Sequence, residues 1–274
     1  MSVNEREEAI MQEEKMHRST YRVLKIFELL SATSEGMSLT GLAQRLEIPK
    51  GSLHPILKTM QAMNFIRMND NGNYTIGQAA YFAGSSYTKN SDLLQEIDYV
   101  LKNLSSAVNQ TAYFSVLSGG EVLYLLEERV PTPITIQAKR GYKYPAYATG
   151  IGKALLSGKT EKDIKTLYPE GLYKLTEYTI DDFDTLFSQM EETQKSGYSF
   201  EKEESTKDVQ CIAVPVKYKE NVIAGMSVAV PVFYYSEEFE KKAMEELKKA
   251  RQHIEKLIQD NTREWVYSPL ETEA

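Results

Sequence analysis

SLTGLAQRLEIPKGSLHPILKTM, residues 38–60, reads as two short helices separated by a turn. We expect Thr40 to cap the first helix, whose apolar residues face inward: Leu42, Ala43 and Leu46. Glu47-Ile48-Pro49 predicts a tight turn. In the second helix the apolar residues recur at helical spacing and form the expected inner face: Leu53, Ile56, Leu57, Met60 and Met63.

The outer face of the second helix is polar and partly basic, with Lys50, Ser52, His54, Lys58 and Gln61. Two short helices joined by about three residues, the second with such a face, are typical of a helix-turn-helix. We therefore expect the following residues to contact DNA: Lys50, Gly51, Ser52, His54, Pro55 and Lys58. The alternative is a solvated face of a winged helix that does not bind DNA.

Pro55 lies inside this second helix. Proline lacks a backbone N–H, and in a helix interior it costs about 3 kcal/mol. The sequence therefore predicts either a late start, with Ser52 as the N-cap, or a kinked helix that begins near Lys50, rather than an ideal helix. With the late start, Gly51 would lie in the turn.

The segments on either side extend this pattern. Val23, Phe27 and Leu30 form one apolar stripe and predict a helix over about residues 20–32. After the second helix, two short apolar runs at 65–68 and 74–76 flank Asn71-Gly72, which can supply the positive φ angles of a tight hairpin. A hairpin in this position is a wing, so residues 20–77 predict a winged helix-turn-helix.

The remaining sequence mixes strands and helices. Gly84-Ser85-Ser86 predicts a linker over residues 78–90, and a helix over about 93–108 is expected to connect the two halves. Strands are then expected at 112–117, 122–126, 134–138, 198–201, 212–216 and 222–230. Helices are expected at 150–157, at 183–197 and from 236 onward. This order favours an α+β fold with a mainly antiparallel sheet.

These elements suggest the domain boundaries. We expect a tail at 1–16, a winged helix-turn-helix at 17–80, a linker and linker helix at 81–108, a C-terminal domain at 109–262 and a second tail at 263–274. The length of the chain agrees with this division, because 274 residues are enough for about two domains.

Charge is distributed unevenly along the chain. The net charge is −7, yet residues 15–90 hold nine Lys/Arg and four Asp/Glu, net +5, while residues 91–274 hold 22 and 30, net −8. A basic module fused to an acidic one suggests an anion-binding function for the first. The single cysteine, Cys211, excludes an internal disulfide, and the polar N-terminus is no secretory signal, so we expect a cytoplasmic protein.

Several motifs in one order resemble the isocitrate lyase regulator (IclR) family of bacterial transcription regulators. They cover residues 18–262 and comprise the segment 38–60, NGNYTIG at 71–77, GGEVLY at 119–124, ATGIGKAL at 148–155, GYS at 197–199, Glu203-Glu204 and VQCIAVPV at 209–216. The resemblance implies a winged helix-turn-helix, a linker helix and a C-terminal domain similar to GAF sensor domains. It further implies double-stranded operator DNA and a small effector, often a carboxylate, as partners, and a homodimer or a tetramer built from dimers. Family members repress or activate nearby operons.

The resemblance also implies an effector site formed by Gly150, Ile151, Glu201, Cys211, Ser227 and Ala229. Glu201 stands where the carboxylate-binding prototype has Asp, and Ala229 stands where it has a second Ser, so the ligand is expected to be less polar there, or larger. Tyr147 occupies a position where His is common. Gly150-Ile151 would open a helix, whose free N–H groups favour a carboxylate.

Other interpretations of these residues remain open. Cys211 can equally be a buried core thiol, and the cluster Tyr142, Tyr144 and Tyr147 can stack on a ligand, although we favour a role at the edge of the core. Glu201–Glu204 is read as solvated surface unless it binds the effector. His17, His54 and His253 are too scattered for a metal site or for a Cys-His pair. We therefore expect no cofactor, no metal and no catalysis. The expected function is a DNA-binding regulator that responds to an effector, and the alternatives are an enzyme with a DNA-docking module and a ligand-independent DNA-binding protein.

Overall fold

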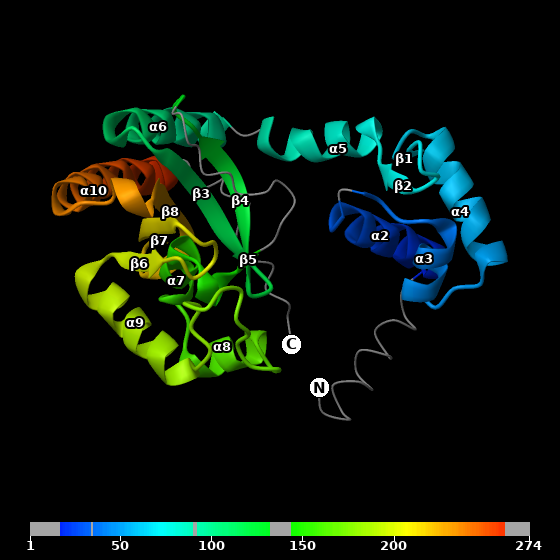
Figure 1. The fold of residues 1–274 in the computed structure, drawn as a ribbon. Coiled ribbons are helices and arrows are strands. Elements are labelled where there is room, and N and C mark those ends of the chain that lie inside the picture. The colour runs from blue at the N-terminus through cyan, green and yellow to red at the C-terminus, as the bar shows by residue number, and fades with distance from the viewer. Residues whose placement is uncertain (1–16, 34, 90–91, 132–143, 261–274) are drawn as a thin grey trace. The chain divides into compact units, whose positions relative to one another are not determined.

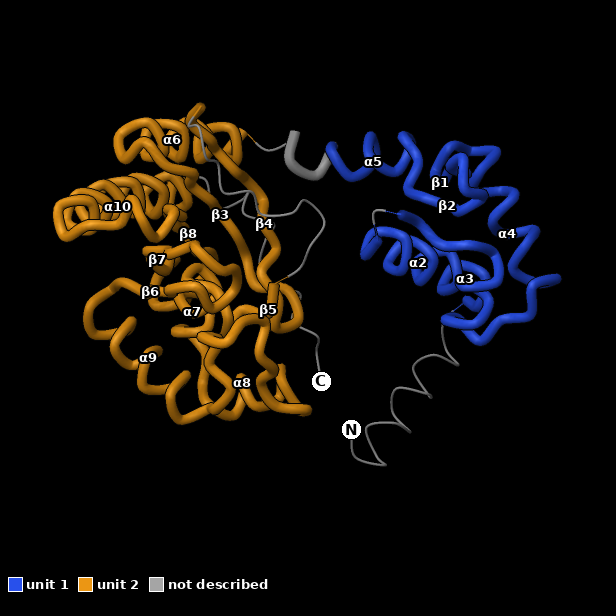
Figure 2. Tube along the Cα trace, viewed as in Figure 1, with its two compact units in different colours: residues 1–90 blue, residues 91–274 orange. Residues whose placement is uncertain are grey.

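The computed structural model describes residues 17–33, 35–89, 92–131 and 144–260. The chain divides into two compact units, residues 1–90 and 91–274 (Figure 2). The tails expected at 1–16 and 263–274, the strand expected at 134–138 and Tyr142 lie outside the described residues.

The first unit has the expected winged helix-turn-helix fold (Figure 1). Its elements are α2 (Arg18–Ser31), α3 (Leu39–Arg45), α4 (Lys50–Ala62), β1 (Ile66–Met68), β2 (Tyr74–Ile76) and α5 (Gln78–Lys89). The core of this unit joins α2, α3, α4 and the hairpin through side chains that are almost fully buried: Ile26, Leu30, Leu42, Leu53, Leu57 and Ile66.

Two local expectations in this unit are wrong. Ser38, not Thr40, caps α3, because the Ser38 hydroxyl accepts a hydrogen bond from the Gly41 amide at 3.1 Å. Met63 does not belong to the inner face: it follows the last turn of α4 and is 60% exposed.

The residues expected to form a linker at 78–90 are helical as far as Lys89, in α5. Helix α5 begins at Gln78, directly after the wing, and its chain is anchored by a hydrogen bond from the Ala79 amide to the Asn64 carbonyl. Gly84 does not break the helix, since a single glycine inside a helix costs only about 1 kcal/mol.

The β1–β2 hairpin of the wing turns through three residues, 70–72, which are closed by a hydrogen bond from the Asn69 amide to the Asn73 carbonyl, rather than through a two-residue turn. Gly72 has φ +75°, whereas Asn71 is not among the residues with positive φ. The Asn69 side chain holds the loop by accepting hydrogen bonds from the amides of Asn71 and Asn73. One left-handed glycine after a type I turn is the usual solution for a loop of this length.

The second unit contains one six-stranded antiparallel sheet with helices on it, the expected α+β fold. The strand order is β5-β4-β3-β8-β7-β6. Its elements are α6 (Asp92–Val108), β3 (Thr111–Ser118), β4 (Glu121–Glu128), β5 (Tyr144–Pro145), the 3₁₀ turn η1 (Ala146–Ala148), α7 (Gly150–Leu156), α8 (Glu161–Leu167), α9 (Phe183–Ser196), β6 (Ser199–Lys202), β7 (Val209–Tyr218), β8 (Asn221–Pro231), η2 (Val232–Tyr234) and α10 (Glu237–Asp260).

The helices form a layer on each face of this sheet (Figure 1). Helices α6 and α10 pack together on one face, and α7 and α9 cover the other. The helix expected to connect the two halves, α6, is thus a core element of the second unit, where its Ile97, Leu101 and Leu104 are buried. Its apolar stripe is too wide for a solvated connector.

Candidate functional site

The exposed face of α4 carries every residue predicted to contact DNA. All six are exposed: Lys50, Gly51, Ser52, His54, Pro55 and Lys58. Their spacing along α4 leaves Leu53, Leu57 and Met60 buried on the opposite face. The face is accessible to a ligand, and it bears two lysines and no carboxylate.

The late start predicted for this helix is wrong. Helix α4 begins at Lys50 with Pro49 as its N-cap, and the Pro49 carbonyl accepts hydrogen bonds from the amides of Ser52 and Leu53 at 2.9 and 3.1 Å. Pro55 therefore lies inside the helix, as the kinked alternative requires. Because Pro55 has no N–H, the Gly51 carbonyl lacks its usual helical donor.

The second unit contains a cavity of about 270 Å³ next to the start of α7. Five of the six residues predicted for an effector site line it: Gly150, Ile151, Cys211, Ser227 and Ala229. The rest of its wall is not predicted by the sequence and consists mainly of aromatic side chains and of a loop: Tyr113, Tyr124, Phe233 and residues 205–209.

Strand register explains why these residues meet. Across neighbouring strands, Glu201 pairs with Cys211 and Cys211 pairs with Ala229. Tyr113 pairs with Ser227 in the adjacent row. Directly paired residues point to the same side of a sheet, so four strands contribute side chains to one patch under α7.

Gly150 permits a close approach of α7 to this patch. A Cβ atom at this position would lie 3.1 Å from the Cβ atom of Cys211, which is tighter than normal contact. Thr149 caps the helix by accepting a hydrogen bond from the Gly152 amide at 3.0 Å. All seven residues of α7 are buried, so the start of the helix is firmly positioned at the cavity.

The tyrosines near the cavity divide between two roles. Tyr113 and Tyr124 form an edge-on pair with centroids 5.2 Å apart, and Tyr144 also lines the cavity. Burial raises the pKa of the Tyr124 phenol well above its usual value, so it remains a neutral hydrogen-bond donor. Tyr147 belongs to the core: it is fully buried, and its hydroxyl donates to the Tyr173 carbonyl at 2.9 Å.

Glu201 does not line the cavity but supports the loop that does. Its Oε1 accepts hydrogen bonds from the amides of Glu204 and Ser205 at 2.7 and 3.0 Å. Its Oε2 is buried and has no partner among the described residues. Burial raises the pKa of Glu201 to about 7. Burial and the neighbouring Glu201 also raise the pKa of the Cys211 thiol, which disfavours a nucleophilic thiolate.

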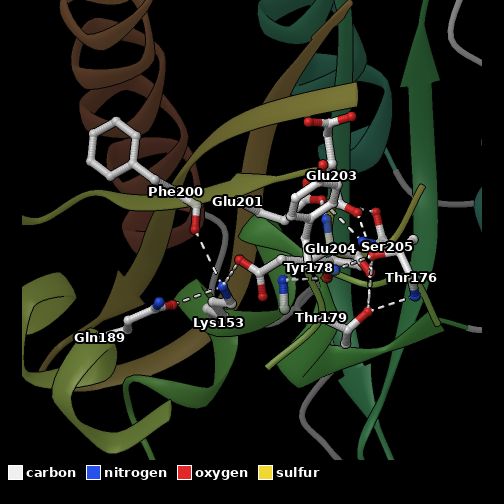
Figure 3. Close-up of polar contacts among 12 residues, drawn as sticks. Lys153, Thr176, Tyr178, Thr179, Gln189, Phe200, Glu201, Glu203, Glu204 and Ser205 are labelled. Atoms are coloured by element: carbon white, nitrogen blue, oxygen red, sulfur yellow. Dashed lines mark hydrogen bonds and ion pairs between the residues drawn. The ribbon is translucent and has the colours of Figure 1, made fainter. Parts of the chain in front are cut away.

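A buried ion pair lies beside Glu201 (Figure 3). The Lys153 ammonium contacts Glu204 Oε1 at 2.5 Å and donates to Gln189 Oε1 at 2.7 Å. Burial lowers the pKa of Lys153, while Glu204 opposes that shift. Reading Glu201–Glu204 as solvated surface is therefore wrong for the two members that are only 1% and 7% exposed, Glu201 and Glu204. Their burial depends on the positive charge of Lys153, which lies in α7, 51 residues before Glu204 in the sequence.

Two threonines from another segment of the chain hold the start of the loop that lines the cavity. Thr176 Oγ1 donates to the Glu203 carbonyl at 2.7 Å, and Thr179 Oγ1 donates to the Glu204 carbonyl at 2.6 Å (Figure 3). Glu203 and Asp208, at either end of the loop, have positive φ angles of 59° and 64°. The loop that forms one wall of the cavity is thus held by side chains from three separate segments.

Glu201→Gln should flatten the pH dependence of stability. The folded-state pKa of Glu201 is raised above its unfolded value, so its contribution to stability is full at acidic pH and is lost as pH rises through about 7. Denaturant unfolding of both proteins between about pH 5 and about pH 8 measures this. The groups facing Glu201, namely Glu204, Lys153 and Cys211, are unchanged in the variant. Equal pH slopes for wild type and variant would contradict the assignment.

Neither a metal-binding cluster nor a membrane-spanning helix is found in the described part of the chain. There, no three His, Cys, Asp or Glu residues come together in a group that could hold a metal ion. Nor does any described helix combine the length and the apolar character needed to cross a bilayer.

Known proteins share both units. The family model "IclR helix-turn-helix domain" matches residues 19–70, and "Bacterial transcriptional regulator IclR C-terminal" matches residues 85–256. The HTH-type transcriptional regulator KdgR of Escherichia coli K12 is 28% identical over 230 residues, 82% of this chain and 88% of the relative. The transcriptional repressor IclR of the same organism is 30% identical over 221 residues, 78% and 80% of the two chains.

Solved structures agree on the fold. An IclR transcriptional regulator from Alicyclobacillus acidocaldarius superposes with a TM-score of 0.79 at 20% identity, covering 88% of this chain and 99% of the other. An IclR homologue from Microbacterium hydrocarbonoxydans, complexed with 4-hydroxybenzoate, gives a TM-score of 0.73 at 18% identity, covering 89% and 100%. With its helix-turn-helix, its antiparallel C-terminal domain and these matches over both, the chain belongs to the IclR family of bacterial transcription regulators.

Proposed function

We propose that this DNA-binding regulator is controlled by a small organic or sugar acid that binds in the cavity at the start of α7. The observation that carries the proposal is the cavity itself, about 270 Å³ in volume and bounded by hydroxyl groups, a thiol and the start of a buried helix. Lys207 is the one basic residue among the described lining residues and can pair with an acidic group of the ligand, while the neighbouring Asp208 also lines the cavity and offsets its charge. The effector would act in the cytoplasm, where the operator DNA is.

The aromatic wall favours a ligand that also has an apolar body. Tyr113, Tyr124 and Phe233 supply ring faces and edges, and Ala229 supplies a methyl group in place of the hydroxyl that the family resemblance would predict. The homologue complexed with 4-hydroxybenzoate has the same fold, and its ligand combines a carboxylate with a ring. Hydroxybenzoates therefore belong in the first panel of compounds, beside short keto acids and sugar acids.

A thermal-shift screen of the full chain against that panel tests the proposal. A ligand at one hundred times its dissociation constant stabilises the folded state by about 2.7 kcal/mol. The second candidate, a ligand-independent DNA-binding protein, requires that no compound shift the melting temperature and that none change operator affinity.

Ser227→Ala and Cys211→Val should weaken the response to the effector while leaving DNA affinity without effector near normal. Each removes a polar group that lines the cavity, and a lost hydrogen bond weakens binding by about 0.5–1.5 kcal/mol. Titration calorimetry of the active compound measures the change. Ser118→Ala, at the exposed end of β3 and outside the cavity, is the matched control. Wild-type affinity in both cavity variants would place the effector elsewhere.

We also propose that the regulator binds DNA as a homodimer or as a tetramer built from dimers. A single short helix reads too few base pairs for genomic specificity, and a two-fold protein reads a two-fold operator. The effector would act by population shift, because it stabilises those arrangements of the two units that it binds best. In the dimer, this would change the distance between the α4 helices of the two subunits.

Replacing Lys50 and Lys58 by Ala should weaken binding to every duplex. Both side chains are exposed on α4, and each phosphate contact that is lost should flatten the log–log salt dependence by about 0.9. Fluorescence anisotropy at several salt concentrations measures affinity and slope together. The control removes two lysines from the second unit, Lys195 and Lys249, which are exposed and paired with glutamates on their own helices. Unchanged affinity and slope in the Lys50/Lys58 variant would exclude α4 as the phosphate-binding helix.

A further inference from the structure

A second cavity, of about 500 Å³, lies at the other end of α7. The ends of α7 and α9, the β7–β8 hairpin and α10 enclose it, and it shares no lining residue with the effector cavity. Helix α7 has seven residues, so its two ends are about 10 Å apart. The two cavities are therefore separate sites joined by one buried helix.

The lining of this second cavity is basic. It includes three basic residues, Lys159, Lys217 and Arg251, and a single acidic one, Glu220. This concentration of positive charge stands out because residues 91–274 carry a net charge of −8. Like charges gathered at one concave surface repel each other unless an anion is present, which indicates a binding function.

Arg251 has donors that nothing in the described residues satisfies. Its Nε is buried without a hydrogen-bond partner, and its Nη1 reaches only the Gly197 carbonyl, at 3.4 Å. A buried unpaired donor is costly. The planar guanidinium presents paired N–H groups whose spacing matches two oxygens of a phosphate or carboxylate.

The three basic side chains are not required as hydrogen-bond donors to the carbonyls at the ends of α7 and α9. The carbonyls at the ends of α7 and α9 have other donors: the Ser157 carbonyl accepts from Gln194 Nε2 at 2.6 Å, and the Thr193 carbonyl accepts from the Gly197 amide at 2.8 Å. Two nearby carboxylates accept hydrogen bonds from neutral donors, Glu255 Oε1 from the Lys217 amide and Asp163 Oδ2 from Thr160, and the charge of Lys159 also acts on Asp163. The charged ends of Lys159 and Lys217 are not needed for these bonds.

We propose that this basic cavity binds a small phosphate-bearing metabolite, independently of the effector cavity. Three cations and the one carboxylate of Glu220 give the lining a net charge of +2, which matches the two negative charges of a phosphate monoester better than the single charge of a carboxylate. Lys159 and Lys217 supply point charges, and Arg251 supplies the paired donors that orient the phosphate. The volume leaves room for an organic body attached to it.

Titration calorimetry of the full chain with inorganic phosphate and with glycerol phosphate, at constant ionic strength, tests this proposal. Saturable binding is expected for wild type and for the control Lys219→Gln, which removes a neighbouring lysine outside the cavity. Lys217→Gln and Arg251→Gln should each bind at least about tenfold more weakly. Lys217→Gln removes no hydrogen bond that its side chain makes among the described residues, so weaker phosphate binding in this variant would not come from a lost structural contact.

The same titrations locate the site and distinguish the ligands. Ser227→Ala, in the effector cavity, should bind phosphate as wild type does. Tighter binding of glycerol phosphate than of inorganic phosphate would assign the site to organic phosphates, and the reverse would assign it to phosphate itself. Absence of saturable binding for both probes, or equal affinities in Lys217→Gln, Arg251→Gln and Lys219→Gln, would overturn the proposal.

Discussion

Lys153→Met is expected to destabilise the second unit by about 3–5 kcal/mol, the usual effect of removing one partner from a buried ion pair. The Lys153 side chain is 1% exposed and contacts Glu204 at 2.5 Å. Methionine fills similar space but leaves the Glu204 carboxylate buried without its counter-charge. Burial already raises the pKa of Glu204, so the loss should grow with pH as the isolated carboxylate is forced to ionise.

Denaturant unfolding of the full chain, followed by a probe in the second unit, measures this effect. Adding Glu204→Gln to Lys153→Met removes the stranded charge and should recover much of the stability, because replacing both partners is far less costly than replacing one. Lys195→Met is the matched control: its exposed pair with Glu191 contributes at most about 1 kcal/mol. If Lys153→Met unfolds like this control, the ion pair does not stabilise the loop beside the cavity.

Much of the fold could be predicted because local patterns and tertiary packing agree. The stripe of Val23, Phe27 and Leu30 and the hairpin residues around Gly72 specify elements without reference to distant parts of the chain. Helix α8 was missed, although Thr160 and Asp163 have the spacing of a capping box and form one. Helix α6 was expected at about 93–108, but a periodic stripe shows only that a helix is buried and not which unit buries it.

The candidate site was predictable only in part. Ser227 lies in the strand expected at 222–230 and Cys211 directly precedes the strand expected at 212–216, and the family resemblance brought both together with Gly150. The loop at residues 205–209 has no periodic pattern, so nothing local places it at the cavity. Charged residues such as Glu204 are normally exposed, and its burial depends on Lys153, which is 51 residues away in sequence.

Pro55→Ala should stabilise the first unit by up to about 3 kcal/mol, since it removes an interior proline and restores the amide that the Gly51 carbonyl lacks. Pro55 is exposed, so alanine meets no packing conflict. Thermal unfolding compared with wild type measures the gain. The size of this gain also provides the reference for a charged substitution at the same position.

Pro55→Arg should give a similar gain in stability and, in addition, tighter binding to all duplexes together with a changed base preference. An exposed arginine on α4 adds a charge that releases counterions, which steepens the salt dependence by about 0.9 for each new phosphate contact. Its paired donors can also read guanine in the major groove. Selection from random duplexes, run in parallel with Pro55→Ala, separates the two causes. A shift of consensus in both variants would come from the restored helical hydrogen bond, whereas a shift in Pro55→Arg alone would come from the guanidinium. The same consensus and affinity in wild type and both variants would show that position 55 does not face DNA.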